Sequence, residues 1–91
     1  MQLHNSLSKF DVFSLNVRGI RDQSKRRSVF SFLKDQKAYI YFLQKTFSEP
    51  NDEKVWKKEW DSEVLFSHGT KHSNGVCSLI NPTAQTQVNY Y

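Results

Sequence analysis

The fold is decided by two short segments, Phe13-Ser-Leu-Asn-Val-Arg-Gly-Ile20 and Ile40-Tyr-Phe-Leu-Gln-Lys-Thr46, separated by a helix-length gap. The first lies in a stretch, residues 10–17, that is rich in β-branched and aromatic residues and ends at the turn signal Arg18-Gly19. This composition predicts a strand. The second lies in the apolar run 39–44, which lacks alternation and therefore predicts a strand buried on both faces.

The residues between these strands carry the period of an amphipathic helix, which we predict over residues 22–36. Its apolar face consists of Val29, Phe30 and Leu33. Either Asp22 or Ser24 has the side-chain oxygen that an N-cap requires. A strand, a helix and a second strand within about thirty residues form a βαβ unit, in which the strands are parallel and the crossover is right-handed.

The rest of the chain predicts smaller elements. A short helix over 55–60 places Trp56 and Trp60 on one face, which we expect to pack against the sheet. Strands are predicted over 63–67 and 75–80, and Cys77 in the second is interpreted as a small buried residue. The domain organisation expected is an N-terminal tail (1–9), one partial domain (10–82) and a C-terminal strand or frayed end (83–91).

Composition bounds the class of protein. The 91 residues are 37% hydrophobic and 14% aromatic, which argues against disorder, and the net charge of +4 favours polyanionic partners. A single cysteine excludes an intrachain disulfide. No apolar run approaches the roughly 18 residues of a membrane span, and the N-terminus lacks the apolar core of a signal peptide. These features predict a soluble intracellular chain with no membrane association.

Several motifs share the order and spacing of a known family. The first segment ends on Asn16, and the second reads Leu-Gln-Lys-Thr, with Lys45 in third place. Phe66-Ser-His-Gly69 and Ser73-Asn-Gly-Val76 follow further along. Over roughly residues 11–82 the chain resembles the endonuclease/exonuclease/phosphatase family, and in particular the AP-endonuclease-like domain of LINE-type retrotransposon reverse transcriptases.

The resemblance implies a fold and a chemistry. The fold would be an α/β two-sheet sandwich, of which this chain supplies the N-terminal portion, less than half and so incomplete. The activity would be Mg²⁺-dependent hydrolysis of DNA phosphodiesters. An enzyme that acts on DNA could also be located in the nucleus, so the resemblance adds the nucleus to the expected intracellular locations. The first motif of the family ends on an asparagine, which Asn16 matches, and the position of Lys45 holds the glutamate that binds the metal in the family.

Lys45 changes that chemistry. A lysine in place of the glutamate shifts the local charge by two units, and a like-charge contact near ~4 Å costs about 4 kcal/mol at an effective dielectric of ~20. We therefore predict that Mg²⁺ does not bind here. Glu49 is a conceivable substitute ligand, but its place in a loop favours an exposed carboxylate. The family's remaining catalytic motifs belong to the second half of the domain and do not occur in this chain.

The individual residues keep alternative interpretations. Asn16 either positions a phosphate or hydrogen-bonds the turn at Arg18-Gly19, with the turn slightly favoured. Lys45 either grips a phosphate as a fixed cation or is a drifted position with no role, and the second is favoured. His68 and His72 match a polar turn of the family, so no catalytic role is assigned to them.

The densest positive cluster follows the first strand: Arg18, Arg21, Lys25, Arg26 and Arg27. It either contacts a DNA backbone or is a solvated helix face, and the sequence does not choose between them. The leading hypothesis for function is a truncated endonuclease domain without activity. The alternative is a small basic nucleic-acid-binding module that does not catalyse, and a third possibility is a remnant with no folded function.

Overall fold

The structure is a computed structural model that describes residues 11–69 and 74–82. The predicted N-terminal tail, the predicted C-terminal strand and His72 lie outside these residues. The elements follow the predicted order: β1 (Val12–Asn16), α1 (Gln23–Lys34), β2 (Ile40–Gln44), a 3₁₀ turn η1 (Pro50–Asp52), α2 (Glu53–Trp60), β3 (Val64–Ser67) and β4 (Val76–Ile80). Within the described ranges, neither helix is long and apolar enough to span a membrane.

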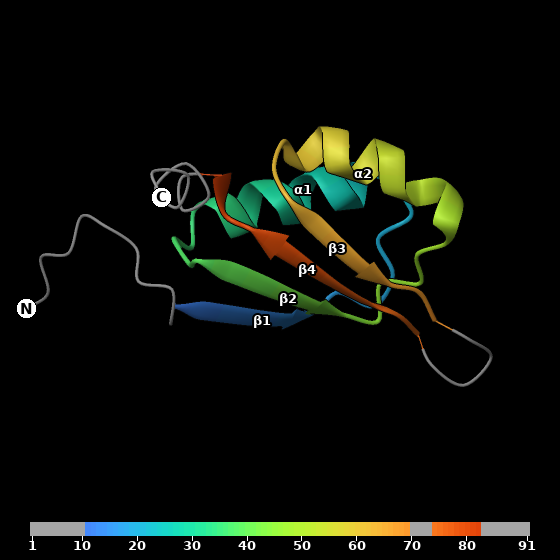
Figure 1. Cartoon of the computed structure of the whole chain (residues 1–91), viewed down its shortest axis with the longest axis horizontal. Helices are drawn as coiled ribbons and strands as arrows, with labels where there is room; N and C mark the ends of the chain where they lie inside the picture. The colour runs from blue at the N-terminus through green and yellow to red at the C-terminus, as the bar shows by residue number, and fades with distance from the viewer. Residues whose placement is uncertain (1–10, 70–73, 83–91) are drawn as a thin grey trace, which may run out of the picture.

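The four strands form one mixed sheet in the order β1-β2-β4-β3 (Figure 1). β1 and β2 are parallel, with Val12 opposite Ile40 and Asn16 opposite Gln44. β4 lies antiparallel to both β2 and β3. The predicted βαβ unit is thus confirmed in its strand pairing, and the described part of the chain is a small mixed α/β unit with a single sheet and two helices.

Helix α1 begins where its sequence supplies a cap. The Asp22 carboxylate accepts a hydrogen bond from the Lys25 backbone N–H at 2.8 Å, which confirms one of the two predicted N-caps. Phe30 and Leu33 on the predicted apolar face are buried. On the same side of the sheet, Phe32 contacts Phe13 of β1 edge to face, with 6.0 Å between ring centroids.

Helix α2 packs through its two tryptophans, as predicted. Trp56 and Trp60 are 1% and 0% exposed. The Trp60 indole N–H donates to the carbonyl oxygen of Ile80 at 2.7 Å, and its ring meets Tyr41 and Phe30 at centroid distances of 5.4 Å. Both helices therefore cover the same face of the sheet, and in Figure 1 they lie behind and above the strands.

The opposite face of the sheet is open. In β2, Tyr41 and Leu43 point into the core and are buried, whereas Phe42 is 36% exposed. The prediction of a strand buried on both faces is therefore wrong for this unit, because both helices lie on one side. Cys77, on the core side of β4, is buried as predicted, and its burial raises the pKa of its thiol to about 12.

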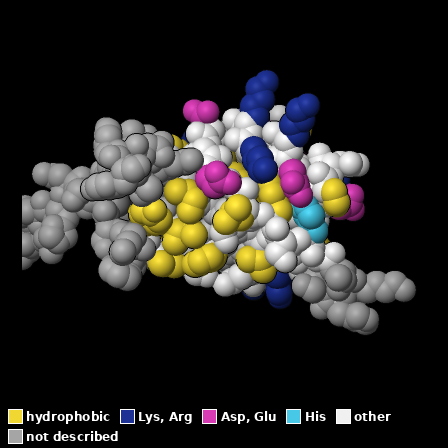
Figure 2. All heavy atoms as spheres, viewed as in Figure 1, with side chains coloured by type: hydrophobic (Ala, Val, Ile, Leu, Met, Phe, Trp, Pro, Cys, Tyr) yellow, Lys and Arg dark blue, Asp and Glu magenta, His cyan; other side chains and the backbone are white. Residues whose placement is uncertain are grey.

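Apolar side chains gather on the open face. Its exposed members include Val12, Phe42, Leu65 and Val76, and Figure 2 shows hydrophobic side chains gathered on the face of the sheet turned to the viewer. Towards the carboxyl ends of β1 and β2 the face becomes polar, where the Gln44 amide donates to the Ser14 hydroxyl at 2.8 Å. An apolar sheet face of this kind is stable when another layer covers it.

Candidate functional site

The parallel pairing of β1 and β2 brings their carboxyl ends together. Asn16 pairs with Gln44, and beyond them the Gly19 N–H donates to the Lys45 carbonyl oxygen at 2.6 Å. Asn16 and Lys45 are therefore neighbours at the carboxyl ends of β1 and β2, as predicted from the βαβ unit. We call the region formed by residues 16–19, 44–47 and 74–75 the strand-end edge.

The backbone of the strand-end edge is held in an uncommon conformation. Left-handed φ values gather there, at Arg18 (52°), Lys45 (57°), Phe47 (56°), Gly19 (86°) and Gly75 (85°). Each non-glycine residue in this region costs roughly 1–3 kcal/mol, and such residues persist only where surrounding contacts over-determine them. Two of these contacts come from the residues just before β4. The Thr46 N–H donates to the Gly75 carbonyl oxygen at 3.3 Å, and the Phe47 N–H donates to the Asn74 carbonyl oxygen at 2.7 Å.

Gly75 is the tightest point of this edge. A Cβ added there would lie 2.9 Å from the Thr46 hydroxyl oxygen and 3.2 Å from the Gly69 backbone nitrogen. Gly75→Ala is therefore expected to lower the free energy of unfolding by about 1–2 kcal/mol from backbone strain, with the steric clash adding to this. Gly19→Ala is the matched control, because its φ is the same within a degree but its Cβ would meet only side-chain atoms of Phe47, the nearer at 3.2 Å, and no backbone. Urea unfolding of both variants checks this, and an equal loss in the two would contradict the steric argument.

Asn16 and Lys45 do not supply the carboxylate ligands that Mg²⁺ prefers. The Asn16 side-chain oxygen accepts from the Arg18 backbone N–H at 3.3 Å, which is the turn contact expected for it. Lys45, at the end of the neighbouring strand, is exposed and ends in an ammonium group, whereas Mg²⁺ is bound by carboxylate oxygens and water. Glu49 does not complete the set, since it is exposed and lies 3.6 Å from Arg21. Within residues 11–69 and 74–82, no three His, Cys, Asp or Glu side chains are grouped to hold a metal.

The basic cluster of the sequence is divided by the fold. Arg18 is exposed at the strand-end edge, and Lys25 joins it there by donating to the Arg18 carbonyl oxygen at 3.1 Å. Arg21 instead forms a two-point contact with Asp52 of η1, at 2.9 and 3.4 Å. Hydrogen bonding to Asp52 raises the pKa of Arg21. This arginine therefore fastens η1 to the start of α1.

Arg26 is buried, and its placement in an exposed basic patch is wrong. All three nitrogens of its guanidinium group donate hydrogen bonds. Two of them donate to the Glu59 carboxylate, one at 3.0 Å. A third donates to the carbonyl oxygens of Ile20 and Arg21, at 3.1 and 2.9 Å. Only 4% of Arg26 is exposed, so it has no surface to offer a phosphate.

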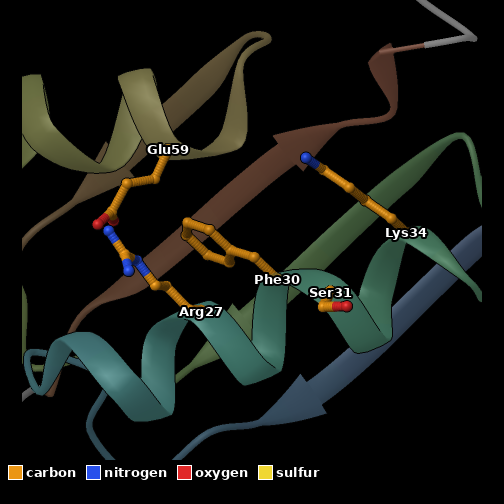
Figure 3. Close-up of a pocket in the computed structure, with 5 residues that line it drawn as sticks. All are labelled: Arg27, Phe30, Ser31, Lys34 and Glu59. Carbon is orange, nitrogen blue, oxygen red and sulfur yellow. The ribbon is translucent and has the colours of Figure 1, made fainter.

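Arg27 lies in the helix layer rather than at the strand-end edge. It borders a hollow of about 400 Å³ between α1 and α2, whose lining also includes Phe30, Ser31, Lys34 and Glu59 (Figure 3). In that view the side chains of Arg27 and Glu59 point toward one another across the hollow. The hydrogen bond from Arg26 lowers the pKa of Glu59, and the charge of Arg27 adds to this shift.

A hydrogen-bond network links three loops beside the strand-end edge. His68 Nδ1 lies 2.8 Å from the Ser48 hydroxyl, and His68 Nε2 lies 2.6 Å from the Glu53 carboxylate. The Ser48 hydroxyl is also 3.2 Å from that of Thr46. Because Ser48 is buried, its oxygen is not presented to a substrate. We call this network, formed by Thr46, Ser48, Glu53 and His68, the clamp. It joins the segment after β2, the start of α2 and the segment after β3.

Comparison with known proteins gives one informative similarity. No family model matches the sequence. A 77-residue stretch, 85% of this chain, is 35% identical to the "Transposon TX1 uncharacterized 149 kDa protein" of Xenopus laevis. This similarity supports a transposon-related origin. The chain spans only 6% of that protein's length.

Sequence reasoning missed several features of the site. The pairing of Arg26 with Glu59 and the clamp at His68 join residues far apart in the chain, and no local pattern marks them. Phe47 is 48% exposed at the strand-end edge, although its apolar character alone predicts burial. The one signal was its position three residues after the end of β2, where the chain leaves the sheet.

Proposed function

We propose that this chain is the N-terminal part of a two-sheet α/β sandwich of the endonuclease/exonuclease/phosphatase type. In this role its strand-end edge binds nucleic-acid phosphates without cleaving them. The observation that carries the proposal is the parallel pairing of β1 and β2, which sets Asn16, Arg18 and Lys45 along one edge. In open α/β sheets, ligands bind outside the carboxyl ends of the strands.

The open face of the sheet supports the sandwich. Helices cover one side, while Val12, Phe42 and Leu65 are exposed on the other. Two packed sheets bury such faces against each other, with about 10 Å between them. A second sheet would come from further polypeptide, and the relative in transposon TX1, a 149 kDa protein, is long enough to contain one.

The charge at the edge supports binding over hydrolysis. Lys45 places an ammonium where the resembling enzymes hold a metal with a carboxylate, and the donor set of Asn16 and Lys45 does not fit Mg²⁺. An exposed ammonium attracts a phosphate oxygen directly, and each phosphate so neutralised releases counterions. Arg18 and Lys25 extend the positive surface from the same edge. The edge thus has the chemistry of a phosphate cradle.

Salt titration tests the proposal. Binding of a fluorescein-labelled 20-base-pair DNA is followed by anisotropy against salt concentration, for the wild type and for Arg18→Gln/Lys45→Gln. Each phosphate contact contributes a slope of roughly −0.9 in log affinity against log salt. The double variant is expected to reduce the slope by roughly 2 and to weaken binding at low salt.

A matched control separates the edge from general charge. Lys57→Gln/Lys58→Gln removes the same charge from exposed positions on α2 and is expected to change the slope little. An equal effect of both pairs would contradict a site at the strand-end edge. Nicking of supercoiled plasmid by the wild type in the presence of Mg²⁺ would overturn the non-cleaving role.

A further inference from the structure

Phe47 is an exposed aromatic residue of the strand-end edge. Nearly half of it, 48%, is open to solvent, although its neighbours Thr46 and Ser48 are buried. Its ring packs over Gly19: a Cβ added to that glycine would lie 3.2 Å from Phe47 Cδ2. The ring is therefore held against backbone on one side and open on the other.

The backbone fixes this orientation. Phe47 has a φ of 56°, a conformation that a bulky residue adopts only under constraint from its surroundings. Its N–H donates to the Asn74 carbonyl oxygen at 2.7 Å, and the preceding residue is tied to Gly75. A side chain presented by a segment with these backbone hydrogen bonds loses less conformational freedom when a ligand contacts it than one on an untethered loop.

Two cationic residues belong to the same strand-end edge as Phe47. Lys45 lies two residues before it, and Arg18 precedes the glycine on which the ring rests. Both cations are exposed, and their segments are joined by the hydrogen bond from Gly19 to Lys45. An exposed aromatic ring on the same edge as exposed cationic residues matches the two parts of a nucleotide, since a base can stack on the ring and a phosphate can meet the ammonium or guanidinium.

From this juxtaposition we propose that Phe47 is a stacking platform for an unpaired nucleobase, so that the strand-end edge binds single-stranded nucleic acid in preference to duplex. The inference rests on the proposed function and narrows its ligand. In a duplex the base faces are already stacked on one another, and a ring at the edge of the sheet gains contact with them only where a base is unpaired. The phosphates alone would give no such preference.

The experiment compares two ligands and three variants. A labelled dT10 oligonucleotide and a 10-base-pair duplex are titrated by anisotropy at one fixed salt concentration. Phe47→Leu keeps the apolar bulk but removes the aromatic face, and it is expected to weaken dT10 binding roughly 5- to 150-fold. Duplex affinity should change less than twofold. Phe32→Leu is the matched control, because Phe32 is 47% exposed but lies on α1, and it should alter neither affinity.

Phe47→Trp supplies a direct readout of stacking. It is expected to retain dT10 affinity, and its added fluorescence, measured against the buried Trp56 and Trp60 of the wild type, should be quenched at saturating oligonucleotide. Phe47→Trp therefore tests the stacking role even if Phe47→Leu does not fold, which loss of its near-UV circular dichroism signal would show.

The outcomes separate the two proposals. Wild-type binding that Phe47→Leu leaves unchanged for both ligands, or an unquenched Phe47→Trp, overturns the stacking role and leaves the phosphate cradle standing. Absence of wild-type binding to either ligand at low salt overturns the proposed function, and the stacking role with it.

Discussion

Trp60→Ala is expected to lower the free energy of unfolding by about 3–5 kcal/mol, a loss large enough to remove the cooperative transition of so small a unit. Trp60 is fully buried, and its ring contacts both Phe30 of α1 and Tyr41 of β2. It thereby joins both helices to the sheet. Alanine would leave a cavity among these rings and an unsatisfied Ile80 carbonyl oxygen.

Thermal melts followed by near-UV circular dichroism measure this effect, because the tryptophans and tyrosines report fixed packing. The wild type is expected to melt cooperatively, and Trp60→Phe to retain a transition at lower temperature. Val55→Ala on the exposed side of α2 is the control and should change stability by less than about 0.5 kcal/mol. A cooperative Trp60→Ala melt at the wild-type temperature would show that the α2 packing described above is not formed in solution.

Glu59→Ala is expected to cost about 3–5 kcal/mol, because it leaves the Arg26 guanidinium buried without its carboxylate. The side chains of the pair are 5% and 15% exposed, so solvent screens them little. The pair also connects α1 to α2, and the cation of Arg26 lies 5.3 Å from the Trp56 ring centroid. Removing the carboxylate therefore loosens the joint between the helices.

A double variant separates the cost of the unpaired buried charge from the loss of the pair itself. Arg26→Met/Glu59→Met replaces both charges with apolar side chains of similar length and is expected to be less destabilised than Glu59→Ala, because no buried charge remains. Urea unfolding at neutral pH supplies the free energies. Equal stability of the wild type and Glu59→Ala would mean that Arg26 is solvated, which would reopen its assignment to the basic surface.

The pH dependence of the pair has a definite sign. The folded-state pKa of Glu59 is lowered, chiefly by the hydrogen bond from Arg26. Its contribution to stability is therefore present above the unfolded carboxyl pKa of about 4.3 and is lost as the pH falls through the lower folded value. The stability gap between the wild type and Glu59→Gln should close below about pH 4.

The sequence by itself predicted the local elements of this chain. The apolar period predicted α1, Asp22 predicted its start, and the spacing of Trp56 and Trp60 predicted the buried face of α2. The parallel strands also predicted that Asn16 and Lys45 would meet at one edge. These inferences rest on residues within a few positions of one another, or on the fixed geometry of a βαβ unit. The sequence likewise placed a lysine, not a carboxylate, at this edge.

Only the tertiary structure decided what each side chain does. The basic cluster lies within residues 18–27, but in the folded chain Arg26 pairs with Glu59, 33 residues away, while Arg18 is exposed at the strand-end edge. Phe42 is exposed because both helices lie on one face of the sheet, and Phe47 is exposed because a left-handed backbone turns it out of the core. Charge and hydrophobicity are properties of single residues, whereas burial and pairing depend on which distant segment packs beside them.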